Sequence, residues 1–371
     1  YQEQVSFLFD KKHLNLLTSI ANRENVPFVV IGNINDTGNI KVISDNEDII
    51  PVDLPHFDDN KKKKFYLEKD KNKYQKIKIG NFNYLNLEIT NNNFEFYLIR
   101  VLNHLSVCSK SFLTNKVDRS VSGLIVQQQC VGPFQLPLAN NSVVNLDFDG
   151  DVGLVSSIGE QPIKGIPNLD GYHIKNMVRL TVSEMLLNMI WTPIEDISKI
   201  NSVANWMWAS KNSKDAYLIN KAVDELVAIV NYLGFSINGG KDSMSMSVDN
   251  ITETIKSPNT LVLSGYSNCI SFNHIILPCL KEYNSVLLYV NLGDNFNLGG
   301  TIFEEIYDNN IKLINKKINK VCNLGSILKL KKLFSLIQKY IKEKRILSGH
   351  DVSDGGLVTA LIEMSISSNI G

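Results

Sequence analysis

The chain has 371 residues, of which 44% are hydrophobic and 20% are charged. This length provides for two or three domains with their own cores, and the composition is that of a soluble globular protein. Lysine plus arginine and aspartate plus glutamate both number 38, so no overall charge would draw the chain to nucleic acid or to a membrane surface.

Targeting and cysteine patterns narrow the class further. No apolar run approaches ~20 residues and no signal-peptide pattern opens the chain, which predicts a cytoplasmic location without membrane partners. The five cysteines are odd in number and show no CxxC spacing. This argues against a zinc site and against a disulfide framework, and favours buried thiols.

The beginning of the chain alternates between strand-like and helical patterns. VSFLF at 5–9 and PFVVIG at 27–32 predict strands, and residues 12–25 between them predict a helix. From 58 to 78 the sequence is rich in Lys and Asn. With no aromatic stacking platform, this segment indicates a solvated insertion and not a nucleic-acid site.

The remainder mixes helices and strands, which predicts an α+β or α/β fold with mixed sheets flanked by helices. The expected elements are a strand at 123–128, an apolar helix at 176–191, a helix at 214–234 that ends at Gly234, strands at 257–269 and 284–293, and an amphipathic helix at 327–344.

The apolar helix contains a polar stripe. It is apolar on nearly every face and should be buried, yet Thr181, Glu184 and Asn188 follow one another at i, i+3 and i+7. A buried carboxylate needs a cation, a metal or a proton, because leaving its charge unpaired costs several kcal/mol. Two interpretations stay open: an internal salt bridge or rim position, or oxygen ligands for Mg²⁺, which usually shares its shell with phosphate oxygens.

The segment INGGKDSMSMSV at 237–248 is a candidate anion site. Gly239 and Gly240 allow close backbone approach, and Lys241 supplies a point charge. It is not a Walker loop, because Phe235 and Asp242 stand where that motif needs Gly and Ser or Thr. A turn that leads into a strand explains the same residues equally well.

The end of the chain predicts a strand at 345–349, a tight HDVSDGG connection, and a helix from 357 with an inward stripe of Leu357, Leu361 and Met364. Ser353 or Asp354 would cap this helix. Its start favours a phosphate, and an acid just upstream can hold the phosphate's metal, although a capped turn without a ligand is the alternative.

No catalytic residue is predicted. His350 is interpreted as a packed or hydrogen-bonded residue and not as a catalytic base. The sequence shows neither a Ser-His-Asp spacing nor a nucleophile elbow.

Several segments together carry a resemblance. QEQVSFLF, NRENVPFVVIG, DRSVSGLIVQQQCVGPFQLPLAN, SIGEQPI, RLTVSEMLLNMIWTPIEDI, SVANWMWA, GGKDSMSMS and HDVSDGGLVTALIEM occur in the order found in large-type phosphoribosylformylglycinamidine synthases. The chain thus resembles this family over almost its whole length, except mainly at the Lys/Asn-rich segment.

The resemblance implies an architecture of A/B domain pairs of the aminoimidazole ribonucleotide synthetase-like superfamily. By this resemblance, residues 1–115 are the C-terminal part of the first synthetase B domain, with the insertion at about 58–78. Residues 116–260 are the second A domain, and 261–371 are a truncated second B domain. The chain is then a central fragment, without the first A domain and the C-terminal glutaminase domain, and is expected to be inactive by itself.

The resemblance also implies an activity and a set of ligands. Family members convert formylglycinamide ribonucleotide, glutamine and ATP to formylglycinamidine ribonucleotide in purine biosynthesis, and the second A domain holds an auxiliary ADP with Mg²⁺. The implied metal ligands are Asn140, Glu184, Asn188 and Asp351, and the nucleotide contacts are Ala139 and Ser353, with Lys241 as a further candidate. Asn140 departs from the Asp that the family often has, so it offers an amide oxygen with one less charge.

Two other functions stay open from the sequence. The chain could be a catalytically inert nucleotide-binding scaffold, or a smaller enzyme similar to aminoimidazole ribonucleotide synthetase. Neither involves nucleic acid or a membrane as partner.

Overall fold

The computed structural model describes residues 4–44, 47–53, 89–120, 123–165, 172–211, 213–250, 253–294, 297–310 and 321–371. These residues belong to two compact units, Tyr1–Phe65 and Tyr66–Gly371, which we describe separately. The predicted insertion at 58–78 lies outside the described residues.

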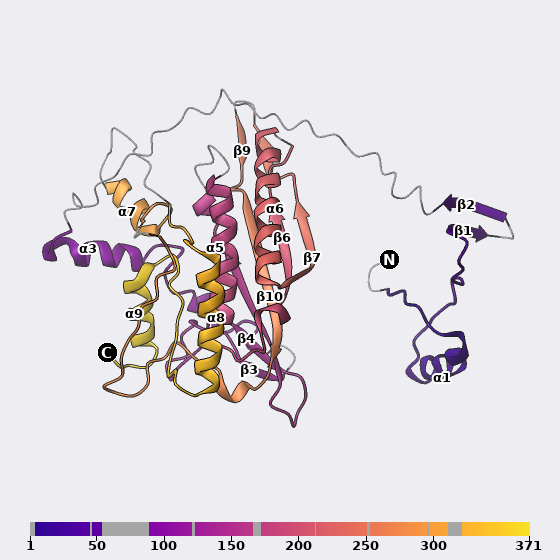
Figure 1. Cartoon of the computed structure of the whole chain (residues 1–371), viewed down its shortest axis with the longest axis horizontal. Helices are drawn as coiled ribbons and strands as arrows, with labels where there is room; N and C mark the ends of the chain where they lie inside the picture. Colours follow the sequence, from indigo (N-terminus) through magenta and orange to yellow (C-terminus); the bar gives the residue numbers. More distant parts are fainter. Residues whose placement is uncertain are drawn as a thin grey trace. The chain divides into compact units, whose positions relative to one another are not determined.

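The described residues of the first unit form an α-helix and a hairpin (Figure 1). A helical turn at Lys11–His13 leads into α1, Leu14–Glu24, which ends at Asn25 in the left-handed conformation. Strands β1, Asn39–Ser44, and β2, Glu47–Asp53, pair antiparallel. The predicted helix is confirmed, whereas the segments 5–9 and 27–32, predicted as strands, are not assigned to strands.

The second unit is organised by a six-stranded sheet in the order β3-β4-β5-β10-β6-β7. Its members are β3 (Ile125–Gln127), β4 (Ser142–Asn145), β5 (Gly153–Glu160), β6 (Asn201–Met207), β7 (Ser236–Ser243) and β10 (Thr260–Cys269). The pairs are antiparallel except β6 with β7, which are parallel and joined through a helix. The predicted mixed sheet is therefore confirmed.

Strand β10 lies in the middle of this sheet, between β5 and β6. It runs through Cys269, although the boundary predicted from the resemblance falls at 260 and 261. A short antiparallel hairpin, β8 (Ser247–Asp249) and β9 (Thr254–Lys256), precedes it.

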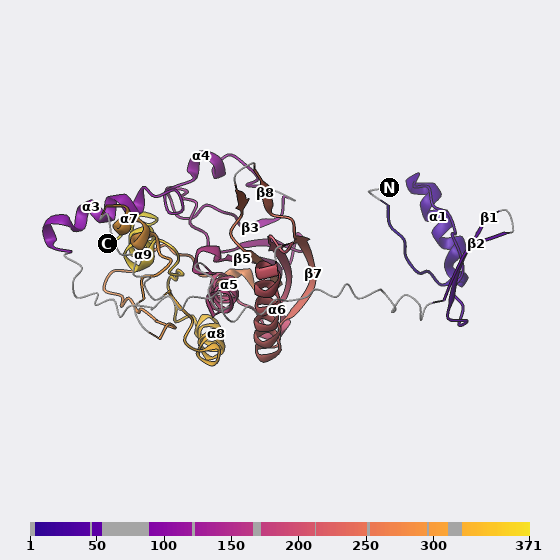
Figure 2. The ribbon, with the colours of Figure 1, turned by 90° about the horizontal axis from the view of Figure 1, so that it is seen from above.

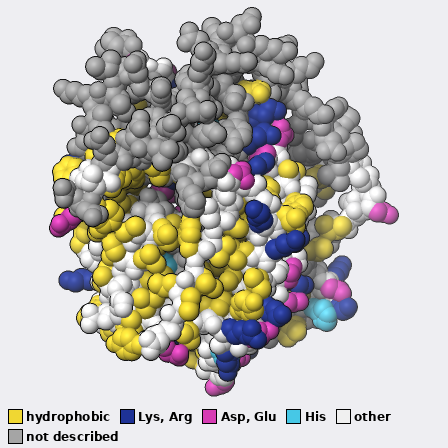
Figure 3. All heavy atoms as spheres, turned by 60° about the vertical axis from the view of Figure 1, so that its left-hand side comes forward, with side chains coloured by type: hydrophobic (Ala, Val, Ile, Leu, Met, Phe, Trp, Pro, Cys, Tyr) yellow, Lys and Arg dark blue, Asp and Glu magenta, His cyan; other side chains and the backbone are white. Residues whose placement is uncertain are grey.

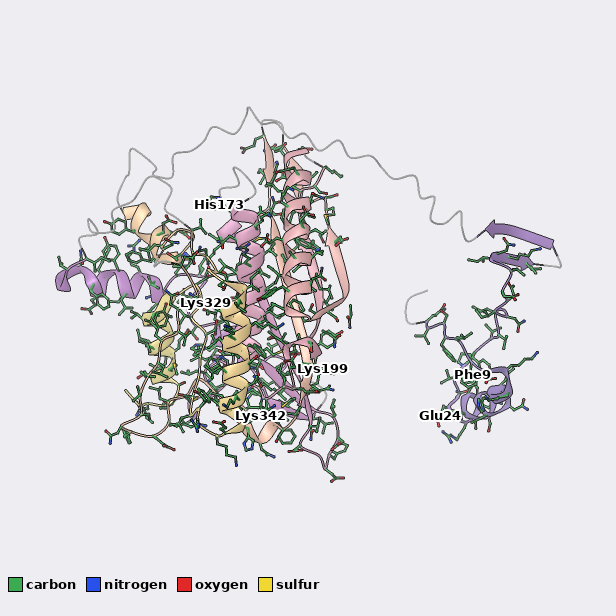
Figure 4. The ribbon with its side chains drawn as sticks, in the orientation of Figure 1. Phe9, Glu24, His173, Lys199, Lys329 and Lys342 are labelled. Carbon is green, nitrogen blue, oxygen red and sulfur yellow. The ribbon has the colours of Figure 1, made fainter. Side chains whose placement is uncertain are left out.

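Helices α5, Tyr172–Met189, and α6, Ser213–Leu233, lie on one face of the sheet, and α8, Ile327–Lys342, packs on these two helices (Figure 2). Figure 4 labels His173 near the beginning of α5 and Lys329 and Lys342 near the two ends of α8, which lies alongside α5. All three helices were expected from their apolar patterns. As predicted, α6 ends at Gly234, whose φ is +90°.

Helix α5 is the centre of the core, because it packs against both β5 and β10. Met177, Met185 and Leu186 are fully buried. The contact with β5 is unusually close at Gly159, where a Cβ atom would lie 2.6 Å from the backbone nitrogen of Met185. The lack of a side chain at Gly159 thus lets the α5 backbone lie directly on the strand.

The other helices in the described ranges of this unit are α3 (Asn91–Leu102), α4 (Ser111–Thr114), α7 (Ile302–Asn310) and α9 (Gly356–Ile366). Short helical turns lie at Pro162–Gly165 (η3), Ile197–Lys199 (η4) and Phe272–His274 (η5). Helix α3 packs on α7 through the rings of Tyr97 and Phe303.

Apolar side chains reach the surface on the side of the unit shown in Figure 3. The segment predicted as a strand at 284–293 is not assigned to a strand in the described part of the chain. Its Val286 and Leu288 are 80% and 85% exposed.

Among the described helices, none combines the length and the apolar character that crossing a bilayer requires.

Candidate functional site

Three segments that are distant in sequence meet beside β5: the residues that precede β4, the middle of α5, and the loop before α9. Asn141, just before β4, donates its side-chain N–H to the backbone oxygen of Asn188 on α5 at 2.8 Å. Its neighbour Asn140 contacts His350 in the loop before α9. The polar residues singled out in each segment are therefore brought into one region.

The polar stripe of α5 faces β5. Glu184 Oε2 accepts a hydrogen bond from the Glu160 N–H at 2.6 Å, and the Asn188 side-chain N–H donates to Ile158 O at 3.0 Å. The hydroxyl of Thr181 is buried without a hydrogen-bond partner among the described residues. The close contact at Gly159 thus places Glu184 and Asn188 at the end of β5.

Burial is the main influence on Glu184 and raises the pKa of its carboxyl group to about 7. The Glu160 N–H and the Gln161 side chain oppose this shift, while the negative charges of Asp351 and Asp354 add to it. None of the described ion pairs includes Glu184. The described residues therefore do not support an internal salt bridge for Glu184. Its carboxyl group needs a proton or a bound cation instead.

His350 lies between two carboxylates. Its Nε2 is 3.0 Å from Glu363 Oε2, and its Nδ1 is 3.3 Å from Asp351 Oδ1. Burial lowers its pKa, but the hydrogen bonds and charges of Asp351 and Glu363 outweigh this and raise the pKa to about 9. A charged, hydrogen-bonded imidazolium fits the predicted structural role and does not fit a general base at neutral pH.

Asn140 has two competing amide orientations. In one, its oxygen faces His350 Nδ1 at 2.7 Å. In the other, its nitrogen donates to Asp351 Oδ1 at 3.2 Å and its oxygen accepts from Trp191 Nε1 at 3.0 Å. A charged His350 favours the first, because its Nδ1–H needs an acceptor, so the Asn140 orientation is coupled to the protonation of His350.

The loop before α9 passes over the ring of Trp191. A Cβ atom at Gly349 would collide with that ring, lying 2.6 Å from its Cη2 atom. Glycine at this position therefore allows His350 and Asp351 to approach the end of α5. The burial of Asp351 in this loop leaves its side chain 11% exposed.

The start of α9 differs from the expectation. Its N-cap residue is Gly355, and no side chain caps the helix. Asp354 instead pairs with Lys164, and Ser353 contributes its backbone oxygen, which accepts from Gly356 N at 3.0 Å. The capping predicted for Ser353 or Asp354 is therefore wrong.

The predicted inward stripe of α9 is also wrong in part. Met364 is buried, but Leu357 and Leu361 are 36% and 38% exposed. Thr359 and Ala360 occupy the buried face instead. The helix is thus rotated relative to the expectation from its leucines.

Ala139 and Ser353 adjoin this region, whereas Lys241 does not. Ala139 directly precedes Asn140, and its N–H donates to Gln129 O at 3.1 Å. Lys241 belongs to β7 and contacts Ser243 Oγ at 3.0 Å. The strand registers align Glu160 with Val262, Asn205 and Lys241 in turn. Three strand spacings therefore separate the Lys241 backbone from Glu160 by about 14 Å.

The donor set fits a hard cation. Carboxylate oxygens of Glu184 and Asp351 and the amide oxygen of Asn188 are ligands that suit Mg²⁺. Within the described ranges, no three His, Cys, Asp or Glu side chains already converge in metal-ligand geometry. A metal here would therefore complete its shell with amide, phosphate or water oxygens.

Sequence reasoning missed four neighbours of this region: Asn141, Lys164, Trp191 and Glu363. Glu363 had a usable signal, because it is a lone acid in an apolar helix, as Glu184 is. Lys164 had none, since its partner lies 190 residues away.

The domain is a mixed sheet with helices on one face and an oxygen-rich cluster at the end of β5. The family comparison assigns it to a class. Residues 109–268 match the model of the FGAR-AT PurM_N-like domain. Phosphoribosylformylglycinamidine synthase of Dictyostelium discoideum is 36% identical over 100% of this chain and 27% of its own length. The Homo sapiens protein of that name is 34% identical over 100% and 28%, and the probable synthase of Caenorhabditis elegans is 34% identical over 100% and 27%.

Over its whole length, this chain thus aligns with a segment of phosphoribosylformylglycinamidine synthases. It spans about a quarter of the length of these relatives, 27% in two of them. Among solved structures, the one described as T. maritima PurL complexed with FGAR aligns with this chain at 15% sequence identity and a TM-score of 0.46. The alignment includes 74% of this chain and 39% of the PurL chain. That score is too low to add to the assignment from the sequence relatives.

Proposed function

We propose that this chain is the part of a phosphoribosylformylglycinamidine synthase that holds an auxiliary nucleotide with Mg²⁺. The observation that carries the proposal is that Glu184 and Asn188 on α5 lie near Asp351 in the loop before α9. The negative charge of Asp351 contributes to the raised pKa of Glu184. These residues come from distant parts of a chain that matches such synthases throughout.

The residues have separate tasks in this proposal. Glu184, Asn188 and Asp351 would hold the metal. Asn140 would be a further oxygen donor in the orientation in which its amide oxygen faces His350. The start of α9 has backbone N–H groups without a side-chain cap, and Ser353 adjoins it, so this end would face phosphate. When bound, Mg²⁺ supplies positive charge to the phosphate oxygens and relieves the repulsion among the acids.

The reaction of the complete enzyme remains part of the proposal. Formylglycinamide ribonucleotide, glutamine and ATP would be its substrates in the cytoplasm, with the first A domain and the glutaminase domain as partners. The reaction would rest on positioning and electrostatic stabilisation, which require no nucleophile from this chain. Lys241 would serve the nucleotide only from a position separate from the acids.

The test is nucleotide binding by purified chain and its variants. Titration calorimetry with ADP and Mg²⁺ should show at least about tenfold weaker binding, or about 1.4 kcal/mol, for Glu184→Gln and for Asp351→Asn. Asp224→Asn is the matched control, because Asp224 is 57% exposed on α6. Unchanged affinity in both site variants would exclude the assignment. Absence of glutamine- and ammonia-dependent turnover in the full-length enzyme would leave an inert nucleotide-binding scaffold.

A further inference from the structure

The candidate site contains one acid more than the metal role requires. Besides Asp351, the charge of Asp354 also acts on Glu184. Glu363 is engaged with His350 at 3.0 Å. Asp354 is 35% exposed and lies in the same loop as Asp351, so it is close enough to influence a cation but is paired elsewhere.

The partner of Asp354 is Lys164, which follows β5 in the turn Pro162–Gly165. The Lys164 side chain is only 7% exposed. Gly300 covers it, since a Cβ atom at Gly300 would lie 3.5 Å from Lys164 Cα and 3.6 Å from its Cδ. An ammonium group with so little access to water needs a counter-charge, and the described ion pairs give it only Asp354.

The ion pair therefore joins two segments of the site. Lys164 follows strand β5, and the last residue of this strand, Glu160, binds Glu184 through its backbone N–H. The loop that carries Asp354 also carries Asp351. A bond between Lys164 and Asp354 fixes how the loop lies against β5, and at the same time it neutralises one of three carboxylates.

We propose that Lys164 is a positioning residue that holds Asp354 away from the bound cation, so that only Glu184 and Asp351 act as its carboxylate ligands. This inference rests on the proposed function. Cation affinity rises with the number of ligand charges, whereas each unneutralised carboxylate repels an anionic nucleotide. By neutralising Asp354, Lys164 lowers the affinity of the site for a cation and raises its affinity for an anionic nucleotide.

A purely structural role of the Lys164–Asp354 ion pair leads to a different expectation. If the ion pair served only to brace the loop, losing it would weaken every ligand alike. If Lys164 instead withholds Asp354, its loss frees a carboxylate, and binding of a divalent cation alone becomes tighter while binding of metal-free ADP becomes weaker. The two ligands respond in opposite directions.

The experiment measures Mn²⁺ binding by electron paramagnetic resonance without nucleotide, and ADP binding by calorimetry without metal. Lys164→Met should bind Mn²⁺ at least about threefold more tightly and ADP at least about threefold more weakly. Lys164→Arg should resemble the wild type, and Lys164→Met with Asp354→Asn should return Mn²⁺ affinity to the wild-type value. Lys221→Met, which removes the partner of Asp224 on α6, is the matched control.

The outcomes separate the two proposals. Unchanged or weaker Mn²⁺ binding by a folded Lys164→Met variant overturns the role of Lys164. A wild-type chain that binds neither Mn²⁺ nor ADP overturns the proposed function itself. If Lys164→Met does not fold, the double variant Lys164→Met with Asp354→Asn decides, because it removes both charges of the pair and leaves neither uncompensated. Its Mn²⁺ affinity should stay within about twofold of the wild type, and a larger loss would show that Asp354 is a ligand.

Discussion

At the scale of single residues, Glu184 lies on the face of α5 that meets β5, where its carboxylate accepts from the Glu160 N–H. Asp351 and Asp354 add negative charge around it, and no described cation pairs with it directly. Its burial raises the pKa to about 7, well above the ordinary value of 4.5. The sequence pattern of a lone acid on an apolar helix therefore corresponds to a real electrostatic cost.

The raised pKa of Glu184 predicts a pH dependence. The protonated carboxyl is favoured in the folded chain, so its stabilising contribution is present below pH 4.5 and is lost as pH rises through about 7. A cation requires the carboxylate form, so Mn²⁺ affinity should rise by up to about tenfold per pH unit below this pKa and level off above it. Calorimetry between about pH 5.5 and 8.5 measures this.

The control for this pH series is Glu184→Gln. It should bind Mn²⁺ more weakly, with most of the rise between about pH 5.5 and 7 removed. If the wild type and Glu184→Gln show the same slope, another group is responsible for the pH dependence. His350 is the titratable neighbour that such a result would implicate.

At the scale of elements, the contact between α5 and β5 places the site. Helix α5 could lie this close to the strand only where a residue without a side chain faces it, and Gly159 is that residue. Glu184 and Asn188 reach the strand backbone as a consequence. The polar stripe and the close packing are therefore one structural feature.

A substitution at Gly159 tests this contact. In Gly159→Ala the new methyl group would overlap the backbone of α5, so the helix must shift, and we expect a loss of about 1–3 kcal/mol in the free energy of unfolding. Gly239→Ala on β7 is the matched control, because nothing lies within 4 Å of the added atom. Urea denaturation measures both, and equal stabilities of the two variants would contradict the close contact.

At the scale of the whole molecule, every residue assigned to the site belongs to the unit Tyr66–Gly371. The other unit contributes a helix and a hairpin, and among its residues 4–44 only Ala21 is buried. The site is therefore built from the sheet and helices of a single unit.

This arrangement predicts the effect of a deletion. A chain of residues 66–371 should bind Mn²⁺ and ADP with Mg²⁺ within about twofold of the complete chain, because no site residue is removed. Calorimetry on both chains makes the comparison, and circular dichroism checks that the shortened chain is folded. A tenfold loss in a folded chain would show that residues 1–65 contribute to binding.

Much of the candidate site could be predicted from the sequence. The polar stripe of α5 and the acid before α9 were visible as residue types in unusual patterns, and the resemblance added Asn140. The structure brings Asn140, Glu184, Asn188 and Asp351 into one region. Lys241 looked equally promising, but strand β7 holds it three strands away from Glu160.

The sequence by itself determined the long helices and the presence of a mixed sheet, because amphipathic or apolar periodicity acts within each segment. It could not decide whether the segments 5–9, 27–32, 284–293 and 345–349 form strands, since a strand forms only where a partner supplies hydrogen bonds. Nor could it show the pairing of Lys164 with Asp354. Only the tertiary structure decided which acids remain free for a cation, because it alone brings distant charges together.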